Sequence, residues 1–230
     1  MTDIDLNFYI RKVASLAQDL KIDLHHGTRK SLNVSSELKK LCKTSPYYRE
    51  IYDYIIDYKQ YNIALRDQGC FQFSESRNSR GEQELRYAYY PNPYQFIDFK
   101  KEVKSIQELF DSGELTDIEY QQLINEAEFI LDIPLVRYDY SPSQYEEKFH
   151  PASHFHIGYH SNNLWPIVRI LNPFIFFIKI ISMYYADIWK ENFNNDLLSL
   201  NDLYERFIFV FFFVPLDYFG VEDRKRFVIF

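Results

Sequence analysis

Apolar residues in the first quarter of the chain recur every three or four positions, which predicts helices. Residues 5–22 carry one such apolar face, made of Leu6, Ile10, Val13, Leu16, Ala17 and Leu20. The stretch His25–Asn33 is polar and is expected to be a loop. Ser35 and Ser36 can cap a second helix, which would run to about Asn62 with an interruption near Pro46.

The period changes to two after Cys70, which is typical of strands. Phe71 and Phe73 alternate with polar residues, and the stretch Leu85–Tyr89 does the same after a polar turn at 76–81, so the two segments predict a hairpin. Residues 94–111 and 116–128 then predict two helices. Thr116 and Glu119 have the spacing of a capping box for the second of them.

The remaining third of the chain mixes both periods. Strands are expected at Ile130–Tyr140 and Ser153–Tyr159, and a long apolar helix from Asn172 to about Trp189. Residues 197–214 suit a helix, although their Phe-rich end is equally typical of a buried strand, and a last short strand is expected at Arg226–Phe230.

This order of elements predicts one α+β domain over residues 1–230, with a small antiparallel sheet of four or five strands packed by helices mainly on one face. Within it, residues 1–62 form an N-terminal helical part, 63–160 the sheet with a helical insertion, and 161–230 a C-terminal helical part.

Composition narrows the class of protein. With 47% hydrophobic residues the chain can build a core, which excludes intrinsic disorder. The net charge of −7 argues against non-specific nucleic-acid binding, but it leaves a local basic site open. Cys42 and Cys70 have no metal-site or disulfide spacing, and neither a signal peptide nor a membrane span is recognisable, so we expect a cytoplasmic protein.

The most informative segment is histidine-rich. Four of the six histidines lie within the run FHPASHFHIGYH, at His150, His154, His156 and His160. On a strand, Phe155, Ile157 and Tyr159 would point into the core. His154, His156, Gly158 and His160 would share the opposite face, with consecutive members of that row about 6.6 Å apart.

The preceding strand has a matching pattern. Val136, Tyr138 and Tyr140 alternate with Arg137 and Asp139. If the two strands pair, Arg137, Asp139, His154 and His156 converge on one face. Arg86, Gln72 and Ser74 of the earlier hairpin are further candidates for that face.

Such a group favours three kinds of chemistry. Two histidines can exchange proton roles on a phosphodiester while Arg137 stabilises the negative charge, which needs no cofactor. Alternatively His154, His156 and Asp139 are a two-histidine, one-carboxylate set for zinc or manganese. A third possibility is recognition of an anion without catalysis. The structural alternative is that these histidines are polar residues on a solvated sheet face.

Several motifs together resemble a known family. RYDY at Arg137–Tyr140, HPASHFHIG at His150–Gly158, NPFIFFI at Asn172–Ile178 and YYADIW at Tyr184–Trp189 are similar to a DUF2290-like bacterial family of unknown function, a resemblance that implies no particular chemistry. A shorter stretch, about 137–158, resembles TumE-type toxins of toxin–antitoxin pairs. They too carry Arg-Tyr-Asp before an H-x-H pair, which implies a toxin or defence protein.

The hypothesis that best combines these observations is a metal-independent nuclease, an RNase, acting as a bacterial toxin or phage-defence protein. His154 and His156 would be acid and base, Asp139 would orient one of them, and Arg137 would bind phosphate, with His150 and His160 as further candidates. The alternatives are a metal-binding protein and a non-enzymatic interaction module. The Phe-rich run Phe207–Val214 is hard to bury in one small domain, so we also expect a homo-oligomer or a partner protein.

Overall fold

A computed structural model describes residues 3–45, 47–129, 134–158, 163–195, 198–208 and 212–225. Its first half contains α1 (Leu6–Asp19), β1 (Asp23–His26), α2 (Ser36–Thr44), α3 (Tyr48–Asp57), β2 (Ile63–Leu65), β3 (Cys70–Arg77), β4 (Gln83–Tyr90) and the 3-10 turn η1 (Pro93–Phe96). Then follow α4 (Ile97–Asp111), α5 (Asp117–Phe129), β5 (Val136–Tyr140), η2 (Pro142–Gln144), β6 (Ser153–Ile157), β7 (Trp165–Pro166) and β8 (Arg169–Ile170). The last elements are α6 (Pro173–Tyr184), α7 (Ala186–Asn192), α8 (Leu200–Ile208), β9 (Phe212–Phe213), η3 (Leu216–Tyr218) and α9 (Val221–Lys225).

The sheet is a meander, because each strand from β1 to β7 pairs antiparallel with the next strand along the chain. The α+β class is confirmed, but within the described residues the main sheet has seven strands instead of the four or five predicted. The extra strands have two to four residues, which is too short for an alternating pattern to be recognised. One of them, β1, lies partly in the segment predicted to be a loop.

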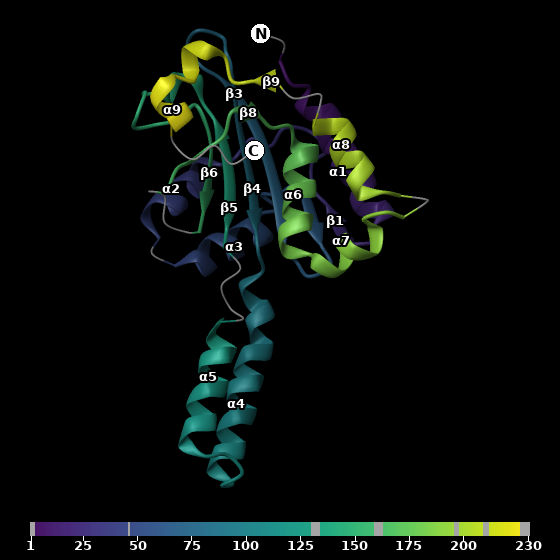
Figure 1. The fold of residues 1–230 in the computed structure, drawn as a ribbon, viewed down its shortest axis with the longest axis vertical. Coiled ribbons are helices and arrows are strands. Elements are labelled where there is room, and N and C mark those ends of the chain that lie inside the picture. Colours follow the sequence, from purple (N-terminus) through teal and green to yellow (C-terminus); the bar gives the residue numbers. More distant parts are fainter. Residues whose placement is uncertain are drawn as a thin grey trace.

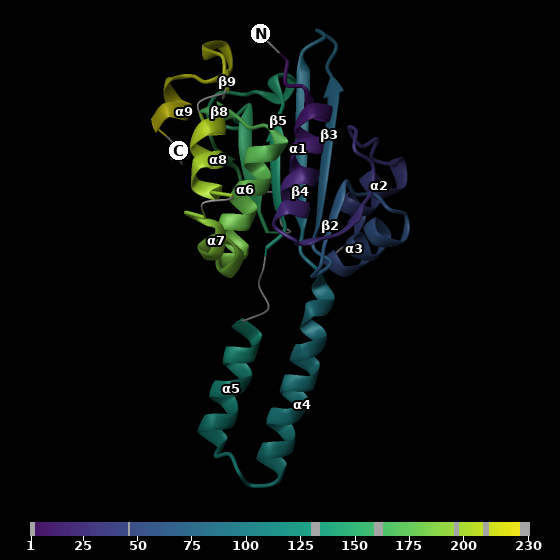
Figure 2. The same ribbon diagram turned by 90° about the vertical axis from the view of Figure 1, so that its right-hand side faces the viewer.

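Helices pack on both faces of this sheet, as Figures 1 and 2 show. On one face α1 and α6 cover the aromatic residues of β3, β4 and β5. Phe71, for example, contacts the rings of Phe176 and Phe177 of α6 at centroid distances of 6.3 and 4.9 Å. On the other face α2 and α3 form a smaller core with Cys70, Ala88, Tyr90 and Leu135. The second face also carries the polar rows of the predicted site.

Helices α4 and α5 form an arm that projects away from the sheet (Figures 1 and 2). It replaces the turn of a hairpin, since β4 and β5 are neighbours in the sheet with Tyr89 opposite Val136. The predicted capping box is confirmed at its tip. The Thr116 backbone N–H donates to Glu119 Oε2 over 2.9 Å, and the Glu119 N–H donates back to Thr116 Oγ1 over 3.3 Å.

Most predicted helices are confirmed with small shifts of boundary, but the one helix predicted from Asn172 to about Trp189 is two, α6 and α7, because the backbone at Tyr185 is not helical. Ser35 caps α2 by accepting from the Leu38 N–H, and Asn172 caps α6 by accepting from the Ile175 N–H. The segment 197–214 contains both predicted alternatives, a helix at 200–208 and a two-residue strand at 212–213. Pro46, residues 130–133 and the expected strand Arg226–Phe230 lie outside the described residues. None of the helices in the described part of the chain combines the length and hydrophobicity that crossing a bilayer requires.

Candidate histidine–aspartate site

The pairing of β5 with β6 brings the predicted site residues together. Asp139 lies opposite His154 and Arg137 lies opposite His156 in the antiparallel register. Since neighbours across a ladder share a face of the sheet, all four side chains emerge on the same side. The prediction that Asp139 and His156 share a sheet face is therefore confirmed. On the neighbouring strand β4, Arg86 lies opposite Asp139 and extends the row.

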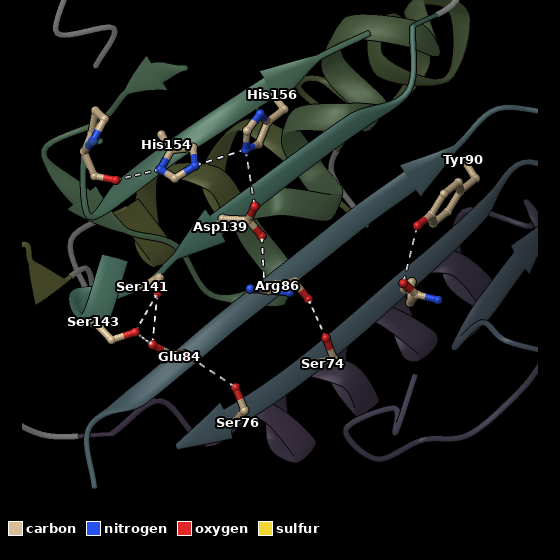
Figure 3. A network of polar contacts seen from close by, with 12 residues as sticks. Ser74, Ser76, Glu84, Arg86, Tyr90, Asp139, Ser141, Ser143, His154 and His156 are labelled. Atoms are coloured by element: carbon tan, nitrogen blue, oxygen red, sulfur yellow. Dashed lines mark hydrogen bonds and ion pairs between the residues drawn. The ribbon is translucent and has the colours of Figure 1, made fainter. Parts of the chain in front are cut away.

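A continuous chain of polar contacts runs through these side chains (Figure 3). The Pro151 carbonyl lies 2.7 Å from His154 Nδ1. His154 Nε2 is 3.1 Å from His156 Nε2, which in turn is 3.3 Å from Asp139 Oδ2. At the far end, Arg86 Nε is 3.8 Å from Asp139 Oδ1. One end of the chain is thus a backbone carbonyl and the other an exposed cation.

Both histidines are nearly inaccessible to water. His154 is 1% exposed and His156 is 7% exposed, so the alternative of a solvated sheet face is wrong for them. The burial of His154 comes from the segments on either side of β6. The His150 ring packs edge-on against His154 at a centroid distance of 4.9 Å, and the short strand β7 places Pro166 opposite His154. By contrast the Asp139 side chain keeps 21% of its surface exposed and Arg86 keeps 58%, so the cluster opens to solvent at this end.

This environment fixes the protonation of His154. Burial, together with the nearby His156, lowers the pKa of His154 to about 4, so the ring is neutral at pH 7. A carbonyl oxygen can only accept a hydrogen bond, so the proton of the neutral ring is on Nδ1 and points at Pro151. His154 Nε2 consequently carries a lone pair directed at His156 and the cluster's centre.

Asp139 is held in its ionised form. Burial alone would raise the pKa of this carboxyl, but the hydrogen bond from His156 and the charge of Arg86 outweigh burial and lower the pKa below its usual value. At neutral pH the cluster therefore contains a carboxylate and a neutral imidazole, both of which are acceptors. His156 Nε2 lies 3.1 and 3.3 Å from these two acceptors, so a hydrogen on this nitrogen, or a cation bound among the three groups, satisfies both of them.

The arrangement brings together three side chains that could hold a metal ion. One ligand atom from each of Asp139, His154 and His156 lies within 4.8 Å of the others. Zinc binds imidazole nitrogen at about 2.0–2.1 Å, which places two ligands of a tetrahedron about 3.3 Å apart. The 3.1 and 3.3 Å separations of the cluster are close to this value. Donation of Nδ1–H to a backbone carbonyl is also how metal-binding histidines are usually oriented.

The same geometry is unfavourable for a pair of histidines acting on opposite sides of a phosphate. The two Nε2 atoms are 3.1 Å apart and face each other, which leaves no space for a phosphodiester between them. His154 Nδ1 is occupied by Pro151, and His156 Nδ1 is buried without a hydrogen-bond partner among the described residues. Neither ring presents a nitrogen to solvent.

The other predicted residues differ in how close they come. Arg137 is beside His156 in register, half-buried, and without an ion pair to the cluster among the described residues. His150 touches His154 but contributes no atom to the candidate metal set. Gln72 is on the same face but donates to the Gln60 carbonyl, and Ser74 donates to the Arg86 carbonyl. His160 lies outside the described residues.

Comparison with known proteins assigns the family. The family model described as "Uncharacterized conserved protein (DUF2290)" matches residues 15–211, most of the chain and all of this site. The chain belongs to the DUF2290 family. No curated protein and no solved structure matches the chain. The shorter resemblance to TumE-type toxins is therefore unsupported, and the DUF2290 assignment brings no named chemistry with it.

Two parts of the site in this DUF2290 member were not predicted. The first is the Pro151 carbonyl, a backbone group whose direction cannot be predicted from the type of residue. A second polar group on the same face joins Glu84 of β4 to the hydroxyls of Ser141 and Ser143 (Figure 3). Glu84 lies two residues before Arg86 on the same strand and therefore shares its face, and this parity is the signal that would have identified it.

Proposed function

We propose that this chain is a metal-dependent hydrolase whose centre is a divalent transition-metal ion, zinc or manganese, held by His154, His156 and Asp139. The observation that carries the proposal is the convergence of three possible ligand atoms within 4.8 Å, with His154 oriented by the Pro151 carbonyl. A metal with three protein ligands keeps a position for water, whose pKa it lowers so that hydroxide forms near neutral pH.

The proposal replaces histidine acid–base catalysis by metal chemistry because the 3.1 Å contact between the rings suits a shared cation better than a substrate. Asp139, the most exposed of the three ligands, is where a substrate would approach. Arg86 stands beside it, and its exposed charge is offset by the Asp139 carboxylate.

The proposed substrate is a nucleic acid, with RNA as the preferred candidate. The chain would then be a nuclease of a toxin or defence system. Charge distribution supports this more than the total charge does. Residues 97–129, the arm, contain nine acidic and three basic residues, a net charge of −6 out of −7 for the whole chain. The rest of the protein, which carries the site, is therefore close to neutral and does not repel phosphates as a whole.

Metal binding is the first test. Full-length protein stripped with EDTA is titrated with Zn²⁺ and Mn²⁺ by calorimetry, and the retained metal is counted by mass spectrometry. We expect one ion per chain for wild type and for the matched control His25→Ala, whose ring contacts Tyr61 away from the site. His154→Ala, His156→Ala and Asp139→Asn should bind at least tenfold more weakly. Wild type without a stoichiometric ion would refute the centre.

Activity is the second test. Cleavage of RNA and of single-stranded DNA is followed with the same variants, before and after EDTA and after adding back Zn²⁺ or Mn²⁺. Loss with EDTA and recovery with metal supports the proposal. Activity that survives EDTA but needs both histidines would instead establish acid–base catalysis and overturn the metal mechanism.

The arm favours a second candidate function, that of a subunit which docks on a basic partner protein. It projects from the body, its charge is strongly acidic, and Ile118 near its tip is 80% exposed. Expression toxicity in bacteria separates the candidates. Toxicity lost in His154→Ala supports the hydrolase, whereas toxicity lost only when residues 97–129 are replaced by a short Gly-Ser loop supports the partner-binding subunit.

A further inference from the structure

Arg137 is a cation without a counter-charge. Among the described residues no carboxylate forms an ion pair with it, and its Nε is buried without a hydrogen-bond acceptor. Arg86, on the neighbouring strand and opposite Asp139, is different because it contacts Asp139 and is 58% exposed. An unpaired, partly buried guanidinium is costly to fold, so its presence beside a candidate site calls for an explanation.

The groups around Arg137 do not supply a negative charge. Cys42 of α2 and Tyr90 of β4 are close enough for Arg137 to pull their pKa values down. For both groups burial is the larger effect and raises the pKa, so thiol and phenol stay neutral at pH 7. The residue opposite Arg137 on β4 is Ala88, whose methyl group fills little of the space between them.

Position links this cation to the candidate metal centre. Arg137 is directly opposite His156, and side chains in such pairs start about 4.5–5.5 Å apart. A guanidinium presents several N–H donors in a plane, which matches two oxygens of one phosphate group. A phosphate bound there would thus lie next to the His154–His156–Asp139 cluster.

We propose that Arg137 forms an oxyanion subsite beside the cluster and that it binds the phosphoryl group of the substrate. The inference rests on the proposed function for what happens to that group, but the binding of the anion itself needs no metal. A phosphodiester of RNA or DNA and a phosphate monoester share this chemistry, and the test distinguishes them.

The test compares wild type with Arg137→Gln, Arg137→Lys and the matched control Arg86→Gln, which removes the same charge from the same face. Binding of inorganic phosphate, acetate, phenyl phosphate and a short RNA without a terminal phosphate is measured on EDTA-treated, full-length protein. Arg137→Gln should weaken phosphate binding about 10- to 100-fold, the effect of losing hydrogen bonds to a charged group. Arg86→Gln should weaken it less than about threefold, because the Arg86 charge is exposed and offset by Asp139.

Thermal unfolding separates a binding role from a structural one. If Arg137 serves the ligand, Arg137→Gln removes an unpaired charge and is at least as stable as wild type. Arg137→Lys keeps the charge without the planar donor pair, so its affinity for phosphate should lie between those of wild type and Arg137→Gln. A large loss of stability in Arg137→Gln, with phosphate binding unchanged in Arg137→Lys, would make Arg137 a structural residue and overturn the subsite.

The outcomes also separate this inference from the proposed function. Stoichiometric metal in Arg137→Gln with phosphate affinity equal to wild type would overturn the subsite and leave the metal centre standing. Phosphate binding that depends on Arg137 in a protein that binds no metal would overturn the metal centre and leave the subsite standing. If the RNA binds more tightly than phenyl phosphate, the ligand is a phosphodiester, and if phenyl phosphate binds more tightly, the ligand is a phosphate monoester. Acetate that binds as tightly as inorganic phosphate would refute phosphoryl recognition.

Discussion

Replacing His154 by alanine should destabilise the metal-free protein as well as remove a metal ligand. The ring is 1% exposed, so its loss leaves a cavity among His150, His156 and Pro166. It also removes the donor to the Pro151 carbonyl, and Pro151 is itself buried. An unsatisfied buried acceptor costs about 1–3 kcal/mol, and the cavity adds a similar amount, so we expect a loss of about 2–6 kcal/mol.

The assay is urea unfolding, followed by far-UV circular dichroism, in EDTA and again with Zn²⁺ or Mn²⁺. Thermal unfolding is followed in the same way. For a chain of this size 1 kcal/mol corresponds to about 2–4 °C, so the melting temperature in EDTA should fall by roughly 4–24 °C. With metal at a hundred times the wild-type dissociation constant, wild type should gain about 2.7 kcal/mol and His154→Ala, which binds at least tenfold more weakly, at most about 1.4 kcal/mol. His150→Ala is the control, because that ring is more exposed and provides no candidate ligand atom.

The result decides between two descriptions of the same residue. A loss below about 0.5 kcal/mol is what substitution on a solvated surface costs, and it would show that the burial of His154 is wrong. A large loss in EDTA with an unchanged gain from metal would mean that His154 is a core residue and that the ion binds elsewhere.

Three further predictions concern other parts of the chain. Replacing residues 97–129 by a short Gly-Ser loop should leave folding and metal stoichiometry intact, because β4 and β5 are already paired neighbours; loss of the folded state on circular dichroism would contradict this. At pH 8 a maleimide should label Cys42 rapidly and Cys70 only after unfolding, since Cys70 is buried and burial raises its thiol pKa; simultaneous labelling of both would contradict the packing of β3. Phe213 is 61% exposed under the Arg169 guanidinium, so we expect self-association that Phe213→Ser weakens, and light scattering that finds only monomer at high concentration would remove this expectation.

Strand parity was the most reliable information in the sequence. The alternation of Arg137 and Asp139 with Val136 and Tyr138, and of His154 and His156 with Phe155, was enough to predict that the polar residues share a face. Alternation is local and depends only on the pleat of a strand, so it needs no knowledge of which strands surround the pair. Strands β2 and β7 have three and two residues, and at that length a period of two cannot be distinguished from chance.

The protonation states of the histidines and the groups that they contact could not be predicted in the same way. Parity places His154 on a face, but the 2.7 Å contact with Pro151 depends on how the chain turns before β6. That contact, and the burial that lowers the pKa of His154, convert an expected proton donor into a neutral acceptor. The preference of the proposed function for a metal ion over acid–base chemistry follows from these tertiary details alone.

Net charge shows why a property of the whole chain is a poor guide to a site. The value of −7 argued against a nucleic-acid substrate, yet −6 of it belongs to residues 97–129. The arm projects from the body, and at physiological ionic strength charges farther apart than about 8 Å are largely screened from each other in solvent. The field at that face is therefore set mainly by its own charged groups, and the acidic arm contributes little to it. These groups are the cations Arg86 and Arg137 and the carboxylates Glu84 and Asp139, which balance in number.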